Sequence, residues 1–389
     1  MSGYLLVLLA AFVTTLTITP LLAKIAHRVN AIAYPTTRSV HTKPIPLIGG
    51  VAMIFGLMAG ILTAMSLEQF DSMFKSSTEP LALVLAAGVI TLVGFVDDIR
   101  EVSPPAKVAG QVLAGSIMSL LGLTMLYFRI PFASFDYIVL SKDIAPVFTI
   151  AAVVVMANAI NLIDGLNGLA AGICVIAGTG LFLYSDRLFK AGLLEGSNLG
   201  PLIAIITVGL GLGFLPWNFF KPITFMGDSG ALLLGLLMAA CTVSVGGRVA
   251  DQFSGQTYFF YAPLFIPLVI LGVPLADTFF SIIRRIIKKR SFSVADKDHM
   301  HHRLMRLGHG PRRTVVILWL WTALLSIIVL VPTYSNGAGN SVIPFAIPAL
   351  GLLLFAFFSP ARNKVNEEDS IEREKRKIAR NFLSSKLKR

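Results

Sequence analysis

The chain has 389 residues, of which 55% are apolar and only 14% are charged, and its net charge at pH 7 is +12. This composition excludes a soluble domain of this size and indicates a protein that crosses a membrane several times. The two cysteines, Cys174 and Cys241, both lie in apolar runs, so the sequence predicts neither a disulfide framework nor a thiolate metal site.

The apolar runs predict an all-α polytopic membrane protein. A membrane-spanning helix needs about 20 mostly apolar residues. The first run has no basic segment before it and no evident cleavage site, which predicts a retained span and not a signal peptide. About 11 runs are candidates for transmembrane helices. They lie at residues 3–23, 46–66, 80–96, 106–126, 144–160, 168–185, 199–215, 229–246, 258–280, 315–333 and 343–359.

Lys and Arg predict the orientation, because cytoplasmic connections carry an excess of these residues. One alternating set of connections, with the C-terminal tail, carries most of the 33 Lys and Arg residues. We therefore expect the N-terminus outside and the C-terminus in the cytoplasm. Residues 1–360 are predicted to form the membrane domain, and residues 361–389 a charged cytoplasmic tail. This tail is predicted either to form a basic amphipathic helix on the inner leaflet or to be solvated and disordered.

Five polar clusters fall in the predicted cytoplasmic connections, and they lie at residues 38–50, 97–98, 158–171, 225–230 and 296–303. Five connections that share one membrane face indicate a single active site. A transporter would instead concentrate polar groups near the midplane, often within internal repeats, and the sequence has no clear repeat. The chain also lacks a Gly-rich phosphate loop of the P-loop type, which argues against an ATP-driven motor.

The most polar of these clusters contains Asn158, Asn161, Asp164 and Asn167, which recur every three residues. In a helical backbone these four side chains would lie near one face. Ionisable groups at membrane depth usually face a cavity or a partner, which favours a functional site. The alternative is a polar contact between packed helices.

Three carboxylates lie at predicted ends of spans. Asp97 and Asp98 end an apolar run, where their charge opposes the helix dipole, and this placement favours a bound cation or a functional role over a solvated pair. Asp228 precedes an apolar run and is predicted to be a helix N-cap, a metal ligand or both, because the two roles are compatible. Together with Asn161 these residues offer hard oxygen donors, which suit Mg²⁺ or Mn²⁺.

The last cluster contains His299, His301 and His302, followed by Arg303. Zinc is disfavoured, because no cysteine is near and adjacent histidines rarely share one tetrahedral site. Histidine and arginine side chains in this pattern favour a phosphate-binding loop. The alternative is a basic membrane-proximal loop produced by the positive-inside rule.

Taken together, the five clusters resemble the polyprenyl-phosphate N-acetylhexosamine-1-phosphate transferase family, which is glycosyltransferase family 4. The resemblance runs from about Arg38 to Arg313 and includes the motifs N-A-x-N-x-x-D-G-x-x-G, F-M-G-D-S-G and H-x-H-H-R. It implies a multi-span enzyme with a cytoplasmic active site. Such an enzyme moves a sugar-1-phosphate from a UDP-sugar to a polyprenyl phosphate and releases UMP.

The resemblance also implies roles for individual residues. Asp228 and Asn161 would hold Mg²⁺. The implied catalytic residues are Asp97, Asp98, Asp164, His301 and His302. The implied substrate-binding residues are Lys43, Asn158, Asn167, His299 and Arg303. Asn167 departs from the pattern, because bacterial members commonly have Asp there.

The histidine motif is similar to that of the bacterial branch that uses UDP-GlcNAc and undecaprenyl phosphate, and it differs from the three consecutive histidines typical of phospho-MurNAc-pentapeptide transferases. We therefore expect the first membrane step of a cell-envelope polysaccharide, such as teichoic acid or O-antigen, at the bacterial inner membrane. The pentapeptide transferase is the alternative, and a transporter is a more distant one. No nucleic-acid partner is expected, and a homodimer is compatible with the sequence.

Overall fold

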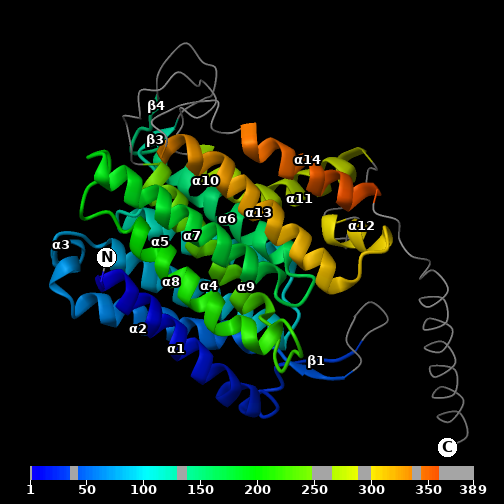
Figure 1. Ribbon diagram of the computed structural model, residues 1–389. Coiled ribbons are helices and arrows are strands. Elements are labelled where there is room, and N and C mark those ends of the chain that lie inside the picture. Colours follow the sequence, from blue (N-terminus) through cyan, green and yellow to red (C-terminus); the bar gives the residue numbers. More distant parts are fainter. Residues whose placement is uncertain are drawn as a thin grey trace, which may run out of the picture.

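The computed structural model describes residues 2–35, 43–128, 138–247, 265–287, 299–334 and 343–358. These residues form a bundle of long helices (Figure 1). Within the described ranges, seven helices are long and apolar enough to cross a membrane, or up to eight if the bent pair Gly49–Met65 and Glu68–Lys75 is one span. The multi-pass membrane architecture is therefore confirmed, whereas the expected number of 11 spans and the orientation of the termini stay predictions.

The seven span candidates are the longest helices of the described chain. They are α1 (Ser2–Ile25), α4 (Glu79–Ile99), α6 (Ala145–Ile163), α7 (Leu169–Lys190), α8 (Gly200–Asn218), α9 (Gly227–Gly246) and α13 (Pro311–Tyr334). The shorter helices are α2 (Gly49–Met65), η1 (Glu68–Phe70), α3 (Asp71–Lys75), α5 (Pro104–Leu120), α10 (Phe265–Ile270), α11 (Gly272–Ile287), α12 (Met300–Arg306) and α14 (Ile343–Phe358).

Two short antiparallel ribbons interrupt the otherwise helical fold, which the prediction of an all-α protein did not include. β1 (Ile32–Ala33) pairs with β2 (Ile45–Pro46), and β3 (Tyr127–Phe128) pairs with β4 (Ile138–Val139). In Figure 1, β3 and β4 lie at one end of the bundle, whereas β1 and α12 lie at the opposite end. The polar clusters described below gather at the end that carries β1 and α12.

Helix α9 is the centre of the bundle. Every residue from Ser229 to Gly246 is buried, and α2, α4, α6 and α8 pack around it. After Asp228 the helix carries no charged residue, and a helix that is apolar on all sides is stable only when it is buried. The elements that surround the first turn of α9 therefore decide what lies around Asp228.

The observed helix ends differ from the predicted ones at the places that matter for the site. α4 continues through Asp97 and Asp98 to Ile99, and α6 ends at Ile163. Asn158 and Asn161 are therefore helical, while Asp164 is the C-cap residue of α6 and Asn167 lies in the turn before α7. The prediction that these four polar residues share one helical face is correct only for the first two.

Some predictions fall outside the described residues. Arg38 and His41 of the first cluster, residues 296–298 of the last cluster and the tail at 361–389 belong to this group.

Candidate active site

Asp98 organises the start of the central helix. Its Oδ1 atom accepts a hydrogen bond from the backbone N–H of Asp228 (2.7 Å), and its Oδ2 atom accepts from the N–H (3.1 Å) and the hydroxyl (2.8 Å) of Ser229. The first N–H groups of a helix have no partner within the helix, and a carboxylate also suits the positive end of the helix dipole. The carboxylate of α4 therefore caps α9, and the alternative prediction that Asp228 itself is the N-cap is wrong.

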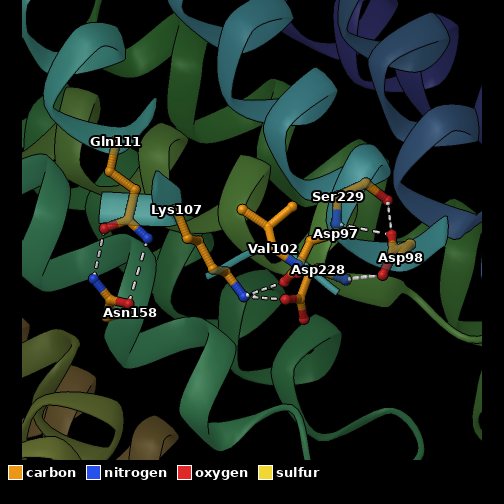
Figure 2. A network of polar contacts seen from close by, with 8 residues as sticks. All are labelled: Asp97, Asp98, Val102, Lys107, Gln111, Asn158, Asp228 and Ser229. Carbon is orange, nitrogen blue, oxygen red and sulfur yellow. Dashed lines mark hydrogen bonds and ion pairs between the residues drawn. The ribbon is translucent and has the colours of Figure 1, made fainter. Parts of the chain in front are cut away.

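Lys107 lies between two carboxylates from different helices (Figure 2). Its Nζ atom, at the start of α5, forms an ion pair with Asp97 Oδ2 of α4 at 3.0 Å and a second ion pair with Asp228 Oδ2 of α9. The second oxygen of Asp97 accepts from the N–H of Val102 at 2.7 Å. With its amide turned to match donors to acceptors, Asn161 donates to Asp228 Oδ1 (3.1 Å) and accepts from Lys107 Nζ (2.9 Å).

These four side chains come from α4, α5, α6 and α9 and are called the carboxylate–lysine cluster below; its members are Asp97, Lys107, Asn161 and Asp228. The side chains of Asp97 and Lys107 are each 15% exposed, and that of Asp228 is 31% exposed. The cluster is thus largely enclosed but open on one side. Adjacent Asp97 and Asp98 do not share one site, because Asp97 binds the lysine whereas Asp98 binds the backbone of α9.

The remaining polar residues of the third cluster lie on both sides of Asn161. Asn158 forms a reciprocal amide pair with Gln111 of α5. The pKa of Asp164 is raised to about 7. The main cause is desolvation of its carboxyl group, and repulsion from the negative charges of Asp228 and Asp98 adds to it. Asn167 is exposed to solvent.

The first polar cluster reaches the start of α9 through its backbone. Phe225, just before α9, donates its N–H to the carbonyl of Pro46 at 2.8 Å, and Gly50 donates to the carbonyl of Met226 at 3.0 Å. A Cβ atom on Gly50 would lie 2.1 Å from the N atom of Gly230, so only glycine allows α2 and α9 to approach this closely. Lys43 is exposed and lies two residues before β2.

The histidine segment, residues 299–303, is positioned by a carboxylate that the sequence did not reveal. Asp277 of α11 is 1% exposed. Its Oδ2 atom lies 2.9 Å from Nδ1 of His299, and its Oδ1 atom accepts from the N–H of Met300 at 2.7 Å, at the first residue of α12. Asp277 therefore orients the His299 ring and also satisfies a backbone donor at the start of α12.

His301 is the most deeply buried member of the histidine segment. Its side chain is 2% exposed, and neither ring nitrogen has a hydrogen-bond partner among the described residues. Burial of the ring, with His302 beside it, lowers the pKa of His301 to about 4. A Cβ atom on Gly165 would lie 2.3 Å from His301 Nε2, so the ring packs against the turn that follows Asp164. Arg303 is exposed.

The structure therefore brings the described parts of the five polar clusters to one end of the bundle. Sequence reasoning missed three residues that connect them, namely Lys107, Gln111 and Asp277. A polar residue inside an otherwise apolar run is the signal that could have revealed Gln111 and Asp277. In the sequence, Lys107 is only one of the Lys and Arg residues whose distribution predicts the orientation.

Comparisons with known proteins found a matching family and several related sequences. The family model described as glycosyl transferase family 4 matches residues 80–246. The chain is 35% identical over 326 residues to a decaprenyl-phosphate N-acetylglucosaminephosphotransferase of Mycobacterium leprae. The match covers 82% of this chain and 81% of the relative.

Two further relatives carry related names. A probable undecaprenyl-phosphate N-acetylglucosaminyl 1-phosphate transferase of Bacillus subtilis is 34% identical, and the match covers 83% of each chain. An undecaprenyl-phosphate alpha-N-acetylglucosaminyl 1-phosphate transferase of Escherichia coli K12 is 28% identical, and the match covers 86% of this chain and 84% of the relative.

Proposed function

Because the chain belongs to glycosyl transferase family 4, we propose that it transfers N-acetylglucosamine-1-phosphate from UDP-GlcNAc to undecaprenyl phosphate. An oxygen of the lipid phosphate attacks the phosphorus that carries the sugar. The bond between this phosphorus and the oxygen bridging to UMP breaks, UMP leaves, and undecaprenyl-diphosphate-GlcNAc remains in the membrane. Relatives named for the transfer of N-acetylglucosamine phosphate to decaprenyl or undecaprenyl phosphate support this choice of substrates.

The observation that carries the proposal is the carboxylate–lysine cluster at one end of a membrane bundle. Joining two anionic phosphates needs positive charge at a fixed place, and preorganised charges act strongly where water is partly excluded. Lys107 supplies one such charge, and its two ion pairs fix its position. The phosphate of the acceptor is largely ionised near neutral pH, so positioning contributes more than a general base does.

We propose Asp228 and Asn161 as the residues that hold Mg²⁺. The cluster fits a hard cation, since three oxygen atoms, from Asp97, Asp228 and Asn161, already surround the ammonium group of Lys107. When bound, Mg²⁺ would neutralise part of the negative charge of the diphosphate. The described residues contain no group of three or more His, Cys, Asp or Glu side chains suited to a metal, so most ligands would come from water and substrate, as Mg²⁺ prefers.

Each of the remaining predicted site residues is proposed to act near one part of the substrates. His301 and His302, with Arg303, are proposed to contact the diphosphate or the sugar. The ring nitrogens of His301, which have no partner in the part of the chain that the structure describes, support this role. Asp164 and Asn167 are proposed to lie near the nucleotide, and Lys43 near the phosphates. Asp97 and Asp98 are proposed to act near the lipid phosphate, Asp97 through Lys107 and Asp98 through the start of α9.

The test is a donor comparison with the purified protein in lipid. With UDP-GlcNAc and undecaprenyl phosphate we expect release of UMP and a lipid-linked sugar, neither of which forms when the acceptor is omitted. UDP-MurNAc-pentapeptide and UDP-GalNAc should react much more slowly. Faster reaction with the pentapeptide would assign the chain to peptidoglycan synthesis, and uptake of intact UDP-GlcNAc into vesicles without UMP would indicate a transporter.

We further propose that the site faces the cytoplasm at a bacterial inner membrane. The native cysteines, Cys174 and Cys241, are both buried, so they give little background in cysteine labelling. Glu101→Cys, at the end that carries the site, should react with an impermeant reagent only after the membrane is opened. Lys190→Cys, at the last residue of α7, should react from outside. The reverse pattern would overturn the orientation.

A further inference from the structure

The amide pair between Gln111 and Asn158 lies beside the carboxylate–lysine cluster (Figure 2). Asn158 Nδ2 donates to Gln111 Oε1 at 2.7 Å and to the carbonyl of Val154 at 2.7 Å, while Gln111 Nε2 lies 3.3 Å from Asn158 Oδ1. Gln111 is completely buried. A buried amide that is left without a partner is destabilising, so each amide depends on the other.

The pair and the cluster use the same two helix faces. Gln111 follows Lys107 by four residues in α5, and Asn161 follows Asn158 by three residues in α6. Residues with these spacings are neighbours on one side of a helix. The two helices are therefore joined by two successive polar contacts, one between Gln111 and Asn158 and one between Lys107 and Asn161.

Helix α5 packs closely on both of its neighbours. A Cβ atom on Gly115 would lie 3.0 Å from the Cα atom of Ile150 in α6, and a Cβ atom on Gly110 would lie 2.6 Å from the side chain of Val93 in α4. Gln111 is the first buried residue of α5, so the amide pair is the buried polar contact of this interface that lies nearest to Lys107. A shift of α5 along α6 would separate the two amides and leave them without partners, so the pair adds a polar determinant of the register next to the cluster.

We propose that Gln111 is a positioning residue for the sugar-phosphate transfer, which holds α5 on α6 through Asn158 so that the Lys107 ammonium lies between Asp97 and Asp228. This inference rests on the proposed function and assigns to Asn158 a positioning role in place of direct substrate contact. The Lys107 side chain is only 15% exposed, and its ammonium group is fixed between two carboxylates from other helices, so the position of α5 decides whether it reaches both.

The first experiment measures turnover in Gln111→Leu, Asn158→Leu and the double variant. Each single change should lower kcat about tenfold or more at saturating substrates, because small misplacements of reacting groups carry large rate penalties. The KM for UDP-GlcNAc should change less than about twofold, because the contacts that bind the substrate equally in the ground state and the transition state are not affected. The double variant should lose no more than either single variant, because both remove one contact.

Rescue and a matched control separate positioning from general stability. Exchanging the two amides, Gln111→Asn with Asn158→Gln, should restore most of kcat. Thr149→Val removes another buried polar contact of α6, to the Thr124 hydroxyl at 3.0 Å near the other end of the helix, and it should lower the melting temperature without changing kcat. If Gln111→Leu lowers the melting temperature as Thr149→Val does and leaves kcat unchanged, the proposal is overturned.

A second measurement needs no substrate. Lys107→Met should lower the melting temperature of the wild-type protein by more than it does in the Gln111→Leu background, because a displaced lysine no longer completes the cluster. Additive effects would overturn the inference. If the wild-type protein releases no UMP but the two changes are non-additive, the proposed function fails while the positioning role of Gln111 stands.

Discussion

The carboxylate–lysine cluster and the histidine segment lie at the same end of the bundle but satisfy their polar groups differently. In the cluster, Lys107 binds Asp97, Asp228 and Asn161, so each of these polar side chains has a partner within the protein. In the histidine segment, His301 is more deeply buried but has two ring nitrogens without partners among the described residues.

This difference indicates how each region prepares for its ligand. A cluster whose polar groups are all paired is preorganised, so its charges need no rearrangement before they act on developing charge. An unpartnered buried nitrogen costs about 1–3 kcal/mol, and a native protein retains such an atom when a ligand or another role compensates for it. We therefore expect changes in the cluster to act mainly on turnover and changes in the histidine segment to act mainly on donor binding.

The largest effect is expected for Asp228→Asn. This change keeps the size of the side chain but removes the only formal charge that Asp228 and Asn161 offer a cation. Turnover at saturating UDP-GlcNAc should fall by about 100-fold or more. The melting temperature should change little, because Lys107 keeps its ion pair with Asp97 and Asp98 still caps α9.

The matched control is Asp186→Asn in α7, since Asp186 also binds a lysine, Lys190, at 2.7 Å but lies outside the cluster. This variant should keep normal turnover and normal dependence on Mg²⁺. Wild-type turnover and metal dependence in Asp228→Asn would place the ion elsewhere, on Asp97 and Asp98.

A smaller effect, mainly on binding, is expected for Arg303→Ala. Loss of a charge-assisted contact to phosphate costs about 1.5–3 kcal/mol, so KM for UDP-GlcNAc should rise by about one to two orders of magnitude. Because Arg303 is exposed, the amount of folded protein should not change. Arg28→Ala, another exposed arginine, serves as the control, and an unchanged rate at limiting UDP-GlcNAc in Arg303→Ala would contradict the assignment.

Asp277 is a buried side chain whose hydrogen bonds are all made within the protein, as in the cluster, but it belongs to the histidine segment's surroundings and positions that segment. Asp277→Ala removes the partners of His299 Nδ1 and Met300 N–H, and kcat/KM should fall about tenfold as the segment loses its orientation. Asp277→Asn can keep both hydrogen bonds and should recover most of the loss. Thr278→Val, next in sequence, alters only a hydroxyl that bonds within its own helix and should have no effect. Equal losses in the Ala and Asn variants would show that charge, and not orientation, is what matters.

The smallest effect concerns stability and pH. Burial lowers the pKa of His301 to about 4, below its usual value of about 6.5. Between these pH values the unfolded chain binds a proton that the folded chain does not, so the wild-type protein loses stability as the pH falls from 6.5 towards 4. His301→Gln lacks this contribution, and its melting temperature should fall less steeply over that range. Parallel curves for the two proteins would mean that His301 ionises normally.

The sequence alone determined the class of the protein and most of its candidate site. Apolar runs of sufficient length predict membrane helices wherever they occur, because every backbone polar group in a membrane must be satisfied within the fold. The alternation of spans then places every second connection at the same end. For this reason Asp97, Asn161 and Asp228 could be predicted to share one site before any contact was known.

Only the tertiary structure decided which of these residues bind one another. Lys107 and Asp228 are separated by 121 positions, and Asp98 accepts a hydrogen bond from the N–H of Asp228, 130 positions later in the chain. No local pattern encodes such pairs, and a lysine at a helix start also satisfies the charge rule for orientation. Gln111 and Asp277 lie within largely apolar stretches, where their partners come from other helices. Their roles depend on helix packing, which fixes register and depth, and these are properties of the assembled bundle that no single segment specifies.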